Sequence, residues 1–73
     1  MDHYRQMQSQ QPKSVQEAQL QFLKHAALAE HYERHKMAYA GNSTAYYKYA
    51  ELQYFHKSRA IYYKSFFSAT SLI

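Results

Sequence analysis

Glycine and proline each occur once in this chain of 73 residues, at Gly41 and Pro12. These two residue types interrupt regular secondary structure more strongly than any others. The stretch 13–40 and the stretch after Gly41 therefore each allow one long, unbroken element. The first is rich in Ala, Leu, Glu, Gln and Lys, which favour helices, and the second is rich in Tyr and Phe, which are weaker helix formers. We expect two long helices, at about 15–40 and about 44–68, joined by a turn at 41–43.

Local signals place the ends of these helices. Ser14 and Glu17 have the spacing of a capping box at the start of the first helix. Gly41 stands where a helix often ends on a residue in the left-handed region, and Asn42 or Ser43 then caps the second helix. Two long helices joined by so short a connection must run antiparallel. The predicted fold is an all-α, antiparallel helical hairpin over residues 14–73, preceded by a flexible, glutamine-rich arm at 1–13.

The first helix is predicted to have one apolar stripe, obtained by placing its residues at steps of about 100°. Glu33 lies in the middle of this stripe, and we expect its carboxylate to reach Lys48 or solvent. Glu17, Lys24, His31 and His35 fall on the opposite, solvent side. The predicted stripe comprises Val15, Ala18, Phe22, Leu23, Ala26, Ala29, Met37 and Ala40.

The second helix has more apolar surface than one neighbouring helix can cover. A seam with alternating spacings of four and three suits packing on the first helix, and it comprises Ala45, Tyr49, Leu52, His56, Arg59, Tyr63 and Phe66. A second apolar line runs down another side of the helix, through Tyr47, Ala50, Tyr54, Ile61 and Leu72. Phe55 and Tyr62 lie on a third meridian, while the plainly polar strip contains Tyr46, Gln53, Lys57 and Lys64.

The uncovered aromatic surface predicts a protein interface. A row of exposed apolar side chains over several helical turns reaches the size at which patches mark interaction sites. The predicted interface residues are Tyr47, Ala50, Tyr54, Ile61, Tyr62 and Phe55. We expect a small protein–protein interaction module, such as an adaptor, regulator or accessory subunit. It would complete a four-helix bundle, either as a homodimer or by docking on a larger partner. Alternatively, the tyrosines lie scattered over the surface with their hydroxyls in water.

Nucleic-acid binding is the second functional hypothesis. The formal net charge is +4, and Lys57, Lys64, Arg59 and Lys48 lie among aromatic residues on which bases could stack. Lys57 and Lys64 share a face, but the four cations do not form one stripe, and four modest charges predict only weak, salt-sensitive binding.

Sites for chemistry are sparse in this sequence. His31 and His35 have the spacing of two metal ligands on one helical face, but no suitable third ligand joins them, so we predict no metal and no cofactor. His56 falls inside the packing seam and is a candidate pH-sensitive residue. Without cysteines, a glycine-rich loop or enough chain to enclose a substrate, the protein is not expected to be an enzyme.

The remaining features concern location and the C-terminus. No apolar run approaches the roughly 20 residues of a membrane span, and residues 1–13 lack the apolar core of a signal peptide. These features predict a soluble, intracellular protein. The C-terminal residues Ser71, Leu72 and Ile73 loosely match a ligand of carboxylate-binding domains, a pattern that arises often by chance.

Overall fold

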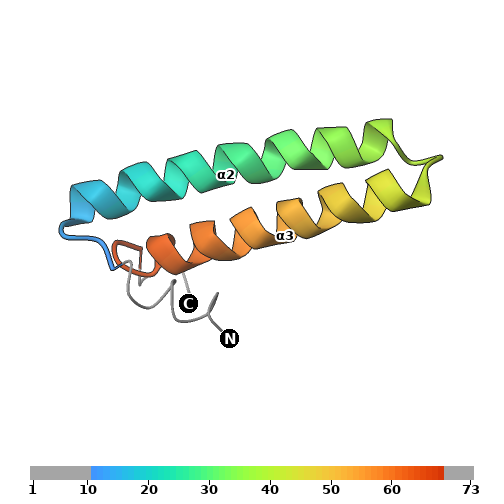
Figure 1. The fold of residues 1–73 in the computed structure, drawn as a ribbon. Coiled ribbons are helices and arrows are strands. Elements are labelled where there is room, and N and C mark those ends of the chain that lie inside the picture. Colours follow the sequence, from blue (N-terminus) through green and yellow to red (C-terminus); the bar gives the residue numbers. More distant parts are fainter. Residues whose placement is uncertain (1–10, 69–73) are drawn as a thin grey trace.

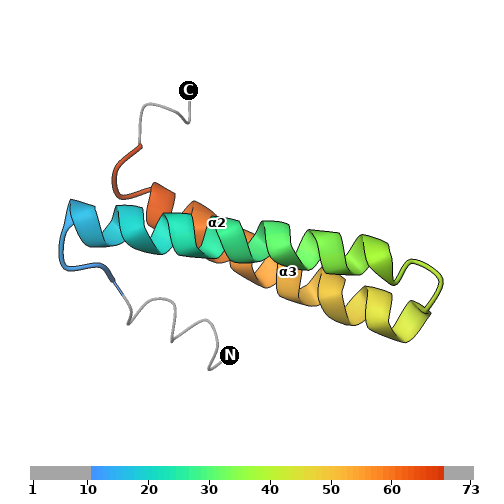
Figure 2. The same cartoon turned by 90° about the horizontal axis from the view of Figure 1, so that it is seen from above.

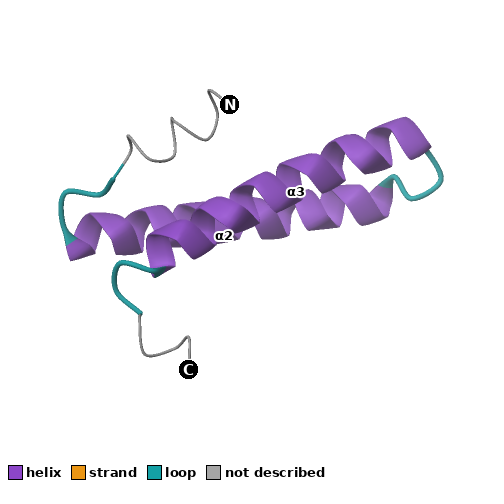
Figure 3. Cartoon of the chain, turned by 90° about the horizontal axis from the view of Figure 1, so that it is seen from below, coloured by secondary structure: helices purple, strands orange, loops and turns teal. Residues whose placement is uncertain are grey.

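The computed structural model describes residues 11–68 of the chain. Over this range it contains two α-helices and no strand: α2, Val15–Ala38, and α3, Ser43–Lys64 (Figures 1 and 3). The helices lie side by side, and the chain reverses its direction between them (Figures 1 and 2). The predicted helical hairpin is therefore confirmed. Of the predicted arm at 1–13, only residues 11–13 are described, and residues 1–10 lie outside the described range. The C-terminal Ser71, Leu72 and Ile73 also lie outside it.

The start of α2 shows why the helix begins where the sequence predicts. Ser14 has an extended backbone, and its Oγ accepts a hydrogen bond from the Glu17 amide at 3.0 Å. Glu17 Oε2 in turn accepts from the amide of Lys13, at 2.9 Å. Two amide groups at this helix terminus that have no partner inside the helix are thereby satisfied. The acidic Glu17 also lies in the first turn, where it complements the positive end of the helix dipole.

We predict that Ser14→Ala lowers the free energy of unfolding by about 1 kcal/mol, because alanine cannot accept from the Glu17 amide. Urea unfolding followed by circular dichroism measures the change. Ser58→Ala, an exposed position inside α3, is the matched control and should cause no loss of stability. Equal stabilities of Ser14→Ala and the unmodified chain would show that this cap does not hold the end of α2.

The turn between the helices differs from the prediction at Gly41. The first helix ends at Ala38, where the Tyr39 amide donates to the carbonyls of His35 and Lys36, each at 3.2 Å. No described residue has a positive φ, so the left-handed conformation expected of Gly41 is wrong. The turn closes instead through the Asn42 amide, which donates to the Tyr39 carbonyl at 2.9 Å. Because α2 ends before Gly41, no left-handed residue is needed to terminate it.

The second helix begins as predicted but ends earlier. Asn42 caps it, since its side-chain Oδ1 accepts from the Ala45 amide at 3.1 Å. The helix stops at Lys64 rather than near residue 68, and residues 65–67 form a turn. The Ser65 hydroxyl donates to the Tyr62 carbonyl at 2.6 Å, a local hydrogen bond of the kind that competes with continued helix.

The seam predicted on the second helix is the side of α3 that packs on α2. Arg59 and Tyr63 are buried, and Phe66 is the most exposed member of the seam. The half-buried members are Ala45, Tyr49, Leu52 and His56. A spacing of alternately four and three residues therefore identified the contact face correctly on this helix.

The stripe predicted for the first helix is wrong in part. Leu23 and Met37 are largely exposed, whereas His25, absent from that stripe, is buried. Also, the ring of His35, predicted to face solvent, lies 5.2 Å from the Tyr49 ring. The contact face of α2 follows a spacing of four and three through Ala18, Phe22, His25, Ala29 and Tyr32. On this face the flat rings of His and Tyr pack against the rings of α3. A ranking of the residues by hydrophobicity selects Leu and Met instead, and therefore does not predict this contact face.

Candidate functional site

A column of stacked rings forms the centre of the hairpin. Neighbouring ring centroids along this ring column lie 5.0 to 6.2 Å apart, and the rings are close to parallel. In order along the hairpin, the ring column contains Tyr39, Tyr49, Tyr32, His56, His25 and Tyr63. Successive rings come in turn from the α2 side, where Tyr39 is the C-cap residue, and from α3, so the column joins the two helices along most of their length.

Two histidines meet inside the ring column. The Nδ1 atoms of His25 and His56 are 2.8 Å apart, so one ring donates its N–H to the lone pair of the other. Burial lowers the pKa of His25 to about 4, helped by the charges of His56, Arg59 and Lys24. Burial also lowers the pKa of His56, with smaller contributions from Arg59 and Lys24. Both rings are therefore neutral at pH 7, which leaves on one of them the Nδ1 lone pair that accepts this hydrogen bond.

Arg59 belongs to the core rather than to the surface. Its Nη2 donates to the Tyr63 hydroxyl at 3.3 Å. Its guanidinium carbon lies 5.6 Å from the centre of the Phe55 ring and 5.8 Å from that of Tyr63, within cation–π distance of both. The positive charge is thus stabilised by aromatic faces inside the hairpin.

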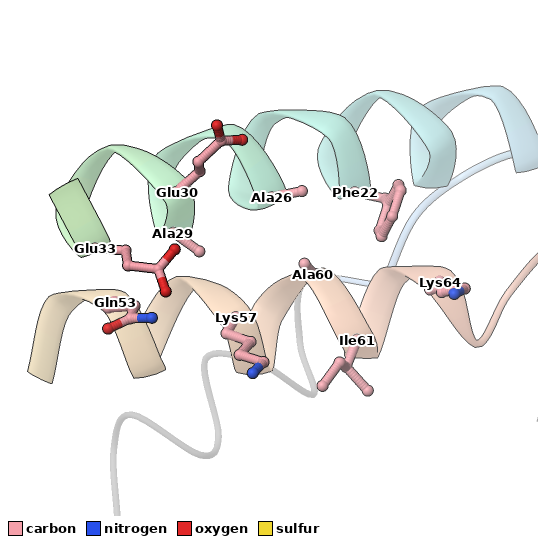
Figure 4. A pocket seen from close by; sticks show the side chains of 10 residues that line it. All are labelled: Phe22, Ala26, Ala29, Glu30, Glu33, Gln53, Lys57, Ala60, Ile61 and Lys64. Carbon is pink, nitrogen blue, oxygen red and sulfur yellow. The ribbon is translucent and has the colours of Figure 1, made fainter. Parts of the chain in front are cut away.

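A groove runs between the two helices on one face of the hairpin (Figure 4). Its volume is about 520 Å³, and both helices line it. Its floor is made by the small side chains of Ala26, Ala29 and Ala60. The remaining lining residues are Phe22, Glu30 and Glu33 from α2 and Gln53, Lys57, Ile61 and Lys64 from α3. We call the side of the hairpin that carries these residues the groove face.

Opposite charges lie on the two walls of the groove. The α2 wall carries Glu30 and Glu33, and the α3 wall carries Lys57 and Lys64. Glu30 is paired within its own helix, with Arg34 at 2.8 Å. Glu33 extends toward Gln53 (Figure 4) and, like Lys57, forms no ion pair with another residue of the range 11–68. Glu33 is exposed, so the expectation that it reaches solvent holds, while the pairing with Lys48 does not occur.

Exposed apolar side chains border the groove on both sides. On α3, Ile61 lines the groove and Tyr54 lies seven residues before it; their side chains are 59% and 62% exposed. On α2, Leu23 and Met37 are 61% and 64% exposed. Positions 23, 26, 30, 33 and 37 follow the three-four spacing of one helical face, so Leu23 and Met37 share a face with the groove residues of α2.

The predicted interface residues divide between two faces of the hairpin. Tyr47, Tyr54 and Ile61 are exposed and follow one another at intervals of seven on α3, and Ala50 on the same side is half-buried. Phe55 and Tyr62 are also half-buried, but Phe55 lines a separate hollow with Lys48, Glu51 and Leu52. The exposed apolar surface on the groove face therefore includes only part of the predicted set. Leu23 and Met37, which were assigned to the core, extend it on α2.

The basic residues considered for nucleic-acid contacts also separate. Lys57 and Lys64 lie at the groove, Lys48 lies beside the hollow around Phe55, and Arg59 is buried in the core. The ammonium group of Lys64 lies over the Phe22 ring, 5.9 Å from its centre. The four cations do not form the single basic stripe along which a phosphate backbone would bind.

The surface histidines form an aromatic contact. The rings of His31 and His35 meet edge to face at 4.4 Å, and His35 also contacts Tyr49. No group of three or more potential metal ligands occurs within residues 11–68. Neither α2 nor α3 is long and apolar enough to cross a membrane.

Comparison of the sequence with protein-family models, with curated proteins and with solved structures finds no significant match.

Proposed function

We propose that this chain is a small protein–protein interaction module that docks through its groove face. The observation that supports the proposal is the exposure of Tyr54, Ile61, Leu23 and Met37, each more than half accessible. Ile61 lines the groove, and helical spacing places the other three beside residues that line it. Burying a large apolar side chain completely is worth about 1.5–3 kcal/mol. Covering these four side chains, starting from half exposure, therefore gains several kcal/mol toward association.

The size of the groove face suits a specific complex. A helix of 24 residues is about 36 Å long, and two packed helices present a width of about 20 Å. The face thus offers about 700 Å², close to the roughly 800 Å² that each partner contributes to a standard interface. Tyrosine suits its edge, because the ring supplies contact area while the hydroxyl remains in water.

Photo-crosslinking tests this proposal without assuming the partner. We expect that p-benzoylphenylalanine in place of Tyr54, in the cells that naturally produce the chain, gives a discrete crosslinked protein product. The same crosslinker in place of Leu20 is the matched control, since Leu20 is exposed on α2 away from the groove and should give none. Equal labelling at both positions, or no product at Tyr54, would contradict docking through the groove face.

A further inference from the structure

We infer that the groove face binds a second copy of this chain, with the groove faces of the two copies together and a two-fold axis parallel to the helices. This inference rests on the proposed function and specifies its partner. In this arrangement α2 of each copy lies against α3 of the other, and the four helices form a bundle with antiparallel neighbours.

The distribution of charge selects this partner. The groove wall on α2 is acidic, through Glu30 and Glu33, and the wall on α3 is basic, through Lys57 and Lys64. A two-fold axis parallel to the helices keeps every residue at its own level and places the acidic wall of one copy opposite the basic wall of the other. Glu33 and Lys57, which are unpaired within residues 11–68, then lie on facing walls of the two copies, about one helical turn apart along the bundle. The surface is complementary to itself, as a two-fold interface must be.

The other two-fold packing of the same faces is disfavoured. An axis perpendicular to the helices would place α2 on α2 and α3 on α3. In that packing the acidic walls of the two copies face each other, and so do the two basic walls. Like charges are then adjacent and repel. Only the packing of α2 on α3 makes both contacts attractive.

The shape of the groove allows two copies to approach closely. Its floor of Ala26, Ala29 and Ala60 leaves space that large side chains of the second copy can fill. Leu23 and Ile61 stand at the borders, on α2 and α3 respectively, so each is brought beside the opposite helix of the other copy. Small residues in the middle and large apolar residues at the borders give interlocking surfaces.

The first arm of the test identifies the associating face. Light scattering and sedimentation of the full chain should give a dimer that dissociates on dilution, and Ile61→Asp should weaken its Kd about tenfold or more. Leu20→Asp, an equally exposed apolar position away from the groove, should retain the Kd of the unmodified chain. Both substituted side chains are exposed, so circular dichroism should show unchanged helicity.

The second arm tests the pairing of α2 with α3. Glu33→Lys and Lys57→Glu should each weaken self-association about tenfold, because every symmetric dimer contains the altered contact twice. An equimolar mixture of the two variants should form a heterodimer with a Kd within about threefold of the original. Glu51→Lys, an exposed carboxylate beside the hollow around Phe55, is the matched control and should have no effect.

The outcomes separate this inference from the proposed function. A dimer that Ile61→Asp weakens, but that the mixture of charge variants does not restore, overturns the two-fold arrangement and leaves the interaction module standing. A chain that remains monomeric overturns the inference as well, and crosslinking at Tyr54 then decides the proposed function separately. If the mixture of Glu33→Lys and Lys57→Glu restores the Kd, and Glu51→Lys leaves the Kd unchanged, the packing of α2 on α3 of the second copy is established.

Discussion

Replacing Tyr63 with alanine is expected to leave the hairpin largely unfolded at room temperature, so that heating shows no cooperative unfolding transition. Tyr63 is buried, its ring stacks on His25 at 5.8 Å, and its hydroxyl accepts from Arg59. Truncating a buried aromatic side chain to alanine costs about 3–5 kcal/mol. A single core of this size supplies only about 3–5 kcal/mol of stability, so the loss removes most or all of it. Thermal melting followed by circular dichroism at 222 nm measures the effect.

Two further variants give this prediction its controls. Tyr47→Ala removes the same side chain from an exposed position and should change the free energy of unfolding by no more than about 0.5 kcal/mol. Tyr63→Phe keeps the ring but loses the acceptor of the Arg59 hydrogen bond, and we expect a cost of about 1 kcal/mol. A Tyr63→Ala chain that melts like the unmodified protein would show that the ring column does not form the core.

Acidification from pH 7.5 to pH 5 should destabilise the folded chain by about 2 kcal/mol through His25 alone. The pKa of His25 is about 4 in the folded chain and about 6.5 when unfolded. Between these values the unfolded chain binds a proton that the folded chain excludes, so stability is complete above pH 6.5 and falls toward pH 4. His56, whose pKa burial also lowers, adds to the loss in the same direction. Urea unfolding at the two pH values measures the difference.

Histidine variants assign this pH dependence. The double variant His25→Gln, His56→Gln should lose most of the difference between the two pH values, although it starts from a lower stability. His31→Gln alters an exposed ring outside the ring column and should retain the difference in full. Unfolding curves of the unmodified chain that coincide at pH 5 and pH 7.5 would contradict a neutral His25–His56 pair in the core.

The backbone architecture was largely predictable from local signals. Pro12 and Gly41 delimit the first helix, and the caps at Ser14 and Asn42 fix where α2 and α3 begin. The helix ends were less predictable, because they depend on turn hydrogen bonds that have weak sequence signals. At Ser65, for example, the hydroxyl bonds to the Tyr62 carbonyl and the helix stops.

The contact face of α3 was predictable, whereas that of α2 was not. On α3 the seam with alternating spacings of four and three matches the contact face, and it contains the buried Arg59 and Tyr63. On α2 a hydrophobicity criterion prefers Leu23 and Met37 over His25 and Tyr32, yet the latter two face α3. The reason is that burial of His25 depends on both helices. A hydrogen-bond partner and stacked rings lower the free-energy cost of burying a neutral imidazole, and here they come from the opposite helix. One helix alone does not reveal such a partner.

The candidate site was predictable only in its apolar part. Spacing on the second helix identified Tyr47, Tyr54 and Ile61 as uncovered, and the structure leaves all three exposed. The groove itself was not foreseen, because its alanine floor and its two charged walls come from both helices. The sequence alone does not show that Glu33 and Lys57 lie on opposite walls of one groove, because that relation depends on how the two helices pack.

The mass of the unmodified chain in solution, measured by light scattering from low to high micromolar concentration, tests the self-complementary groove face most directly. We predict a mass that rises from 8.7 kDa to twice that value and then stops rising, as a closed two-fold assembly requires. A mass that stays at 8.7 kDa throughout, or one that grows past the dimer without a plateau, would contradict it.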